Sequence, residues 1–214
     1  MTQPRAISAE DKALRLEAIL DAAERLWLAR PGIMPSMAEI AADAGLAKGT
    51  LYLYFRSKET LFLALHERHL RWFFGRVAAR AATPAPMDIE DMLDVLRRFL
   101  GDTPAFLPLA SLIHGLLERH VPLEVGFEFE QRTQAGLLAA VDSLRPHFPQ
   151  VSLGLMLQSY GLILGLWQLM RPSPLKALMQ ERELYCVCTL DYLNMLETAL
   201  RALWRGALST ETPA

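Results

Sequence analysis

Cysteine is scarce in this sequence. Only two cysteines occur among 214 residues, and residues 1–11 are mixed and polar, without the basic, apolar and small-residue order of a secretory leader. Small secreted proteins depend on disulfides, and signal peptides have that order. We therefore expect no disulfide scaffold, and we expect a cytoplasmic protein.

An excess of either charge is also lacking. The chain has 22 Lys and Arg against 24 Asp and Glu, which excludes a uniformly basic nucleic-acid coat and an acidic disordered chain. The balance is uneven along the sequence, because residues 1–80 carry 12 basic and 9 acidic side chains and residues 81–214 carry 10 and 15. Any binding of nucleic acid must therefore be local.

Strand signals are few. Val and Ile are sparse, alternating apolar and polar runs do not occur, and the good helix formers Leu, Ala, Met, Glu and Arg dominate. We expect an all-α protein of about nine helices. The first helix has an apolar stripe at three- and four-residue spacing, formed by Leu16, Ile19, Leu20, Ala23, Leu26 and Trp27.

A break in this helical pattern lies at Thr83-Pro84-Ala85-Pro86. Two prolines in four residues end a helix, because each lacks an N–H and restricts the residue before it. The break falls where the charge balance changes, which predicts a small N-terminal domain and a larger, apolar C-terminal one.

Residues 36–58 have the pattern of two short helices joined by a turn. Ser36 and Glu39 have the spacing of a capping box, and Gly45 can take the positive φ that a tight turn needs. The pattern of residues 46–55 then predicts a second short helix, in which Leu46, Leu51 and Phe55 face inward. This is the pattern of a helix-turn-helix, whose second helix fits the major groove of B-DNA.

The outward face of the second helix carries groups that suit DNA. Lys48 can donate to a guanine edge or a phosphate, Gly49 allows close approach, and Tyr52 can pack on a thymine methyl. Thr50, Tyr54 and Lys58 are better placed for phosphates, with Lys58 near the start of the next helix. Singly, each could be an ordinary surface residue; together they favour a DNA-binding helix.

The run MAEIAADAGLAKGTLYLYFRSKE, residues 37–59, resembles the DNA-binding motif of TetR-type bacterial transcriptional regulators. The resemblance implies a flexible arm over 1–11, a helix-turn-helix domain over 12–57, a linking helix over 58–82, and a ligand-binding and dimerisation domain over 83–214. It also implies a homodimer that binds a double-stranded, palindromic operator and represses transcription until a small apolar or amphipathic effector releases it. By position, Lys48, Gly49, Thr50 and Tyr52 would face bases or adjacent backbone. Phosphate contacts would come from Ser36, Thr50, Tyr54 and Lys58.

Position 47 departs from the family pattern, which commonly has serine there. Ala47 cannot cap the second helix through its side chain, a loss of about 1 kcal/mol at a typical cap.

Residues 151–170 contain no charge and are long enough to span a bilayer. A membrane-associated protein is therefore an alternative, although no cluster of Lys or Arg marks a cytoplasmic flank. We prefer a buried helix that pairs with a second one over about 177–205 in a four-helix dimer interface. The expected interface residues are Gly161, Gly165, Leu193, Leu196 and Leu200.

An effector pocket has weaker sequence evidence, because bulky apolar residues serve equally well in a core. The family plan places the candidate lining residues in the C-terminal domain: Phe106, His114, Phe127, Tyr160 and Trp167.

An enzyme is not expected. His66 and His69 have metal-ligand spacing but no third ligand near in sequence, and Cys186 and Cys188 are too close for a Cys-x-x-Cys pair. No phosphate-binding glycine loop or nucleophile elbow occurs, so we assign no catalytic residue, no metal and no cofactor. The remaining alternative is a helical interaction protein in which the helix-turn-helix serves only as a scaffold.

Overall fold

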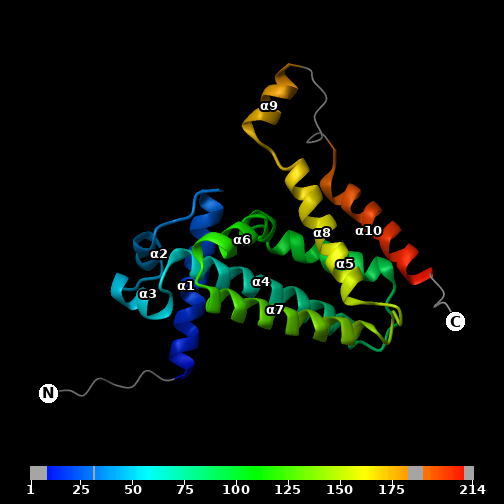
Figure 1. Ribbon diagram of the computed structural model, residues 1–214, viewed down its shortest axis with the longest axis horizontal. Coiled ribbons are helices and arrows are strands. Elements are labelled where there is room, and N and C mark those ends of the chain that lie inside the picture. The colour runs from blue at the N-terminus through cyan, green and yellow to red at the C-terminus, as the bar shows by residue number, and fades with distance from the viewer. Residues whose placement is uncertain (1–8, 31, 183–189, 210–214) are drawn as a thin grey trace. The chain divides into compact units, whose positions relative to one another are not determined.

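The computed structural model describes residues 9–30, 32–182 and 190–209. These residues form helices and loops without any strand (Figure 1), as the composition predicts. The helices are α1 (Ala9–Ala29), α2 (Met37–Asp43), α3 (Lys48–Tyr54), α4 (Lys58–Ala81), α5 (Ile89–Asp102), α6 (Phe106–His120), α7 (Leu123–Leu144), α8 (Leu153–Met170), α9 (Pro174–Glu181) and α10 (Tyr192–Ser209). Ten helices in the described residues confirm the expected all-α class and its approximate count.

The chain divides into two compact units. The first combines residues 1–69 with 104–130, and the second combines residues 70–103 with 131–214. Both α4 and α7 therefore contribute one end to each unit. The boundaries of the four expected segments stay a prediction.

The core of the first unit is built on the predicted stripe of α1. Ile19, Leu20 and Ala23 are buried, and the Trp27 ring meets that of Phe62 edge-on at 5.6 Å between centroids. Two ion pairs join α2 to the end of α1, from Arg25 to Asp43 at 2.7 Å and from Arg30 to Glu39 at 2.6 Å. They leave both acidic side chains of α2 paired with arginines.

A buried arginine ties α4 to α1, which the sequence did not predict. The Arg68 guanidinium donates to Asp21 at 2.6 Å, Glu24 at 2.7 Å and Glu17 at 3.1 Å. Glu24 also meets the Nε2 atom of buried His69 at 2.9 Å. Burial raises the pKa of the Glu24 carboxyl, but the bonds and charges of His69 and Arg68 outweigh it and hold that pKa below its ordinary value.

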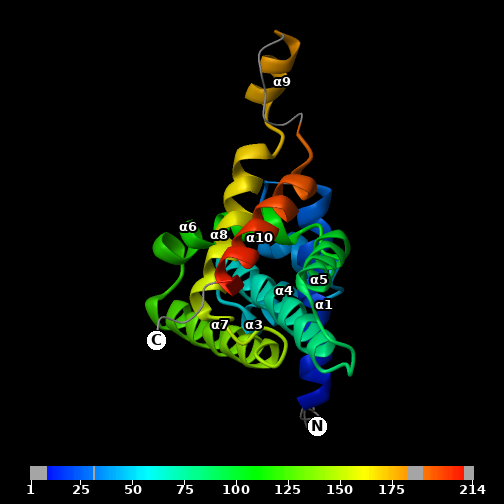
Figure 2. The same cartoon turned by 90° about the vertical axis from the view of Figure 1, so that its right-hand side faces the viewer.

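The second unit has its own apolar core, to which α4, α5, α7, α8 and α10 contribute. Within it α8 and α10 lie side by side in both ribbon views (Figures 1 and 2). The Trp204 indole donates to Ser159 at 2.9 Å, and Ser159 donates to the Leu155 carbonyl at 2.8 Å, so these two buried side chains both have partners. The buried members are Val77, Met87, Met92, Ala140, Val141, Leu144, Phe148, Val151, Leu155, Met156 and Trp204.

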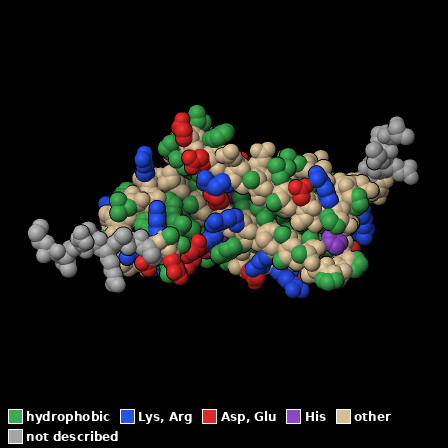
Figure 3. All heavy atoms as spheres, turned by 90° about the horizontal axis from the view of Figure 1, so that it is seen from below, with side chains coloured by type: hydrophobic (Ala, Val, Ile, Leu, Met, Phe, Trp, Pro, Cys, Tyr) green, Lys and Arg blue, Asp and Glu red, His purple; other side chains and the backbone are tan. Residues whose placement is uncertain are grey.

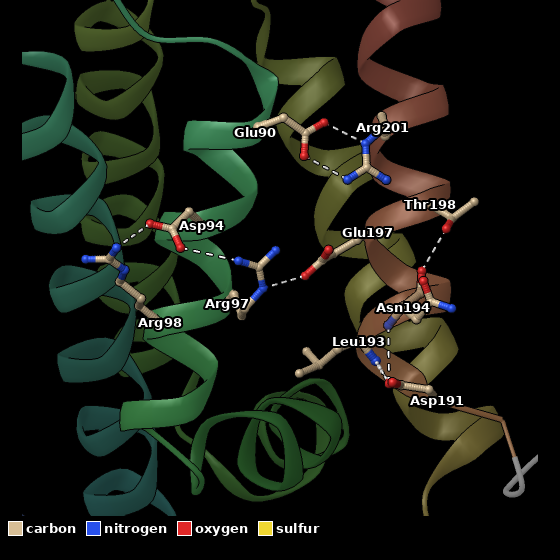
Figure 4. A network of polar contacts seen from close by, with 10 residues as sticks. All are labelled: Glu90, Asp94, Arg97, Arg98, Asp191, Leu193, Asn194, Glu197, Thr198 and Arg201. Carbon is tan, nitrogen blue, oxygen red and sulfur yellow. Dashed lines mark hydrogen bonds and ion pairs between the residues drawn. The ribbon is translucent and has the colours of Figure 1, made fainter. Parts of the chain in front are cut away.

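Ion pairs on the surface join α5 to α10 (Figure 4). Arg201 holds Glu90 through two bonds of 2.6 and 2.8 Å, and Arg97 reaches Glu197 at 2.8 Å. The hydrogen bonds that Glu90 accepts from Arg201 lower the pKa of its carboxyl group. These pairs link α10 to α5, although exposed pairs of this kind contribute little to stability.

The expectation of one helix over about 177–205 is wrong. α9 ends at Glu181, and α10 begins at Tyr192. The Asp191 carboxylate accepts from the N–H groups of Leu193 at 2.9 Å and Asn194 at 3.3 Å, so it caps a new helix instead of continuing an old one (Figure 4). Cys186 and Cys188 lie outside the described residues.

α8 is the one described helix that is both long and apolar enough to cross a bilayer. The core helix of a globular protein passes the same test, and several α8 side chains are buried within the second unit. Length and composition alone therefore do not distinguish the two interpretations.

Candidate DNA-binding site

α2 begins with the capping box that the sequence predicts. The Glu39 N–H donates to the Ser36 hydroxyl at 3.3 Å, and the Ser36 N–H donates to the Glu39 carboxylate at 2.7 Å. This backbone hydrogen bond, together with the bond from Arg30, lowers the pKa of the Glu39 carboxyl to about 2. The start of α2 is therefore fixed by a carboxylate that stays ionised at all physiological pH values.

The turn after α2 depends on Gly45. Its φ is +66°, a region that favours glycine. The Leu46 N–H donates to the Ala41 carbonyl at 2.8 Å, and the Gly45 N–H donates to the Ala42 carbonyl at 3.2 Å. This double hydrogen bond is a Schellman motif, which satisfies the last carbonyls of α2 and turns the chain into α3.

α3 packs against the first unit through one face. Leu51 is fully buried and Phe55, just after the helix, is nearly so. Ala47 occupies the N-cap position with extended backbone and no side-chain hydrogen bond, as its methyl side chain requires. The orientation of α3 therefore depends on its apolar face and on the turn, and not on a side-chain cap.

The outward face of α3 carries the predicted contact residues. Lys48, Gly49 and Tyr52 are exposed, and Thr50 and Tyr54 are half-buried at the edges of this face. The Lys48 ammonium lies 6.0 Å from the centre of the Tyr52 ring, a cation–π contact one turn along the helix. The structure thus gathers these five positions on one short helix.

Lys58 and Ser57 lie at the start of α4. The Thr60 N–H donates to the Ser57 hydroxyl at 3.2 Å, so Ser57 caps the helix and Lys58 is its first residue. The Lys58 side chain is half-buried. The first N–H groups of a helix have no partners within it, and a cation beside them favours an anion.

The segment that contains α3 and the start of α4 has a local excess of positive charge. From Leu46 to Lys58 the sequence has Lys48, Arg56 and Lys58 and no acidic residue. On the face that Figure 3 shows, positive and negative side chains are interspersed. The short basic segment therefore stands out from a mixed surface.

The two histidines with metal-ligand spacing are core residues. His66 is buried with its ring stacked on Phe106 at 5.5 Å, and His69 meets Glu24. Burial, followed by the charges of His69 and His114, lowers the pKa of His66 to about 3. No group of three metal-binding side chains occurs in the described part of the chain.

The candidate effector residues are divided between the units. Phe106 is buried, His114 is exposed and Phe127 is 66% exposed, all in the first unit. Tyr160 and Trp167 are half-buried in α8 of the second unit, where the Trp167 and Tyr192 rings meet edge-on at 5.7 Å. A shared pocket stays a prediction.

The Trp167 indole adds a signal that the sequence did not give. Its Nε1 atom is buried and has no hydrogen-bond partner among the described residues. Such a donor is costly to bury unpaired, at about 1–3 kcal/mol.

Some of the residues expected at the dimer interface are exposed, and others are buried. Gly161 and Gly165 are exposed on α8 with open space above them, and Leu193 is partly exposed on α10. Leu196 is 0% and Leu200 3% exposed within this single chain. The last two therefore pack inside the protomer, and a direct contact with a second copy does not fit them.

Two short helices joined by a glycine turn, with an apolar inner face and a basic, aromatic outer face, define a helix-turn-helix DNA-binding protein. Comparison with known proteins agrees. The family model described as bacterial regulatory proteins, tetR family, matches residues 19–65, and the tetracyclin repressor-like C-terminal domain matches residues 67–211. The chain belongs to the TetR family of transcriptional regulators.

Two relatives in Mycobacterium tuberculosis match part of the chain. An uncharacterised helix-turn-helix transcriptional regulator is 36% identical over 102 residues, which is 46% of this chain and 50% of that protein. The transcriptional regulator EthR is 36% identical over 85 residues, 40% of this chain and 38% of EthR. The chain thus spans half or less of the length of these curated relatives.

Solved structures share the fold over nearly the whole chain. A TetR-family regulator of Mesorhizobium loti has a TM-score of 0.56 and 20% identity, covering 97% of this chain and 98% of that one. The fatty acid degradation regulator FadR of Bacillus halodurans has a TM-score of 0.54 and 18% identity, covering 89% and 94%. At these identities the likeness concerns the fold alone.

Proposed function

We propose that this chain is a cytoplasmic, non-enzymatic repressor that binds a palindromic operator as a homodimer and is released by a small apolar or amphipathic effector. The observation that carries the proposal is the exposed surface of α3, where Lys48, Gly49 and Tyr52 are open to solvent while Leu51 of the same helix is buried. An exposed basic and aromatic face on a helix held by its apolar side suits the major groove.

The contacts divide into two kinds. Lys48, Gly49 and Tyr52 face base edges or the adjacent backbone. Thr50 contributes to both kinds of contact. Ser36, Tyr54 and Lys58 contact phosphates, because they lie at helix ends or at the edges of the α3 face. Phosphate contacts set the register on the duplex, and base contacts give the sequence preference.

An exposed ridge on α8 supports the homodimer. Leu157 is 53% and Leu169 65% exposed, and exposed Gly161 and Gly165 lie between them at four-residue spacing. Residues four apart form a continuous ridge on a helix, and glycines within it let a second helix approach closely. A second copy would cover this apolar ridge.

The effector proposal draws support from Trp167. An effector with a hydrogen-bond acceptor and an apolar body would satisfy its buried Nε1 atom and pack against the aromatic pair with Tyr192. Mixing the protein with small apolar compounds and measuring the release of bound duplex tests this step.

Selection from a random-sequence duplex library tests the DNA proposal. The full chain should retain duplexes with two inverted half-sites whose centres are about 10 base pairs, or a multiple of that, apart. Lys48→Ala should retain a different half-site sequence, because its ammonium would contact a base edge. Arg145→Ala is the matched control, since it removes an exposed cation paired with Asp142 outside the helix-turn-helix.

Two outcomes would contradict the proposal. Retained duplexes without any enriched sequence would leave α3 without a specific role in base recognition. A uniform loss of binding for Lys48→Ala over all sequences would reassign Lys48 to a phosphate.

A further inference from the structure

Leu53 is the most exposed of the large hydrophobic side chains of α3. It is 84% exposed, the highest value among the large hydrophobic side chains of the described residues. A helix turns about 100° per residue, so Leu53 lies about 200° from buried Leu51, on the opposite side of the helix. A single exposed leucine needs no explanation, but this one lies at the centre of the DNA-binding face.

The neighbours of Leu53 leave its side chain open to a ligand. Helical side chains lean towards the N-terminus, so Leu53 lies over the turn that contains Gly49. Gly49 has no side chain, and a Cβ built on it would meet nothing within 4 Å. Tyr52, 45% exposed, flanks Leu53 on one side and half-buried Thr50 on the other.

The whole of α3 fits within one groove. At 1.5 Å per residue its seven residues span about 10 Å, while the major groove is about 12 Å wide. Gly49 and Leu53 are about 6 Å apart along the axis, so both remain close to base edges when the outward face enters the groove.

We propose that Leu53 determines part of the operator sequence by packing on a thymine methyl group. The major-groove edges of the four bases offer hydrogen-bond donors and acceptors, and the thymine 5-methyl is their one apolar group. A leucine at the centre of the face has no hydrogen bond to make, so it favours a base pair that presents this methyl. The inference rests on the proposed function, in which α3 enters the major groove.

Charge complementarity favours DNA over an apolar protein partner at this surface. Lys48 lies on the same helix, Arg56 and Lys58 follow it, and the sequence from 46 to 58 has no acidic residue. The acidic side chains of the preceding helix, Glu39 and Asp43, are held in ion pairs with Arg30 and Arg25. A polyanion therefore fits around Leu53.

The test uses a duplex selected by the wild-type chain and replaces each thymine in turn by deoxyuridine, which removes the 5-methyl group alone. We expect one position in each half-site to weaken wild-type binding about four-fold, the effect of losing one buried methyl group. Leu53→Ala should bind the unmodified duplex more weakly and lose its sensitivity at that position. Leu123→Ala, which truncates an 81% exposed leucine on α7, is the matched control and should keep the wild-type pattern.

The outcomes separate the inference from the function on which it rests. If Leu53→Ala keeps the full deoxyuridine sensitivity, or if only Tyr52→Ala loses it, the methyl contact does not belong to Leu53 and the inference fails alone. If the wild-type chain selects no duplex at all, the proposed function fails with it. Unchanged thermal unfolding of Leu53→Ala verifies that the exposed substitution leaves the fold intact.

Discussion

Lys58 is a residue whose role depends on its position as the first residue of α4, the end of a helix that favours an anion. We expect Lys58→Ala to weaken binding to all duplex sequences alike, because a phosphate contact carries no sequence information. The slope of log affinity against log salt should become shallower by about one for each protomer. Titrations of a selected duplex at several salt concentrations measure this slope.

Arg145→Ala provides the control for Lys58→Ala, because it also removes one cation but outside the helix-turn-helix. It should leave the slope as in the wild type. An unchanged slope for Lys58→Ala would rule out a phosphate contact by this lysine.

His66 couples stability to pH through its burial. Its pKa in the folded protein is lowered to about 3, while an unfolded histidine has a pKa of about 6.5. Below pH 6.5 the unfolded chain binds a proton that the folded chain does not, so this group makes the protein less stable as the pH falls from 6.5 towards 3. The expected loss is about 1 kcal/mol between pH 7.5 and 5.5.

His66→Phe should remove this loss, because phenylalanine keeps the ring that packs on Phe106 and has no proton to bind. Urea unfolding at pH 7.5 and 5.5, at one fixed protein concentration, measures the difference between wild type and variant. His120→Gln, which alters an exposed histidine, should keep the wild-type dependence. A wild-type dependence in His66→Phe would show that other groups cause it.

At the scale of the element, α3 is short and has no side-chain cap. Ala47 already has the extended backbone of an N-cap residue, so a serine fits there without a change of conformation. We expect Ala47→Ser to raise the free energy of unfolding by about 1 kcal/mol, since its hydroxyl can accept from an unpaired N–H of α3. The urea midpoint, with an unchanged slope, is the measurement.

Ala47→Val is the comparison for Ala47→Ser, because valine has no oxygen and should not stabilise the helix start. Equal stability of the serine and valine variants would mean that the N–H groups of α3 gain nothing from a side-chain cap.

At the scale of the whole molecule, the proposed homodimer depends on the close approach of two α8 helices. Gly165→Leu places a bulky side chain on the exposed ridge, where open space now lies above the glycine. We expect a protein that stays helical but sediments as a monomer at concentrations where the wild type is a dimer. Ultracentrifugation and circular dichroism together measure this.

Gly75→Leu is the matched control, since Gly75 is also a helical glycine with open space above it but lies on α4. It should leave the oligomeric state of the wild type unchanged. A Gly165→Leu protein that remains fully dimeric would exclude this ridge as the seam.

The amino-acid sequence by itself determined the helix-turn-helix. The capping box of Ser36 and Glu39, the positive φ of Gly45 and the inward placement of Leu51 all follow from groups a few residues apart. Such local hydrogen bonds and periodicity act wherever the rest of the chain lies, and for that reason a sequence pattern can predict them.

Only the tertiary structure decided the rest, because those features join groups that are distant in sequence or depend on burial. The carboxylates that bind Arg68 are 44 to 51 residues away from it, and no spacing rule pairs them. Burial beside Phe106 made His66 a core residue, and packing of α10 placed Leu196 and Leu200 inside the protomer. Apolar spacing marks a face of a helix as buried, but only the folded chain determines which neighbour covers it.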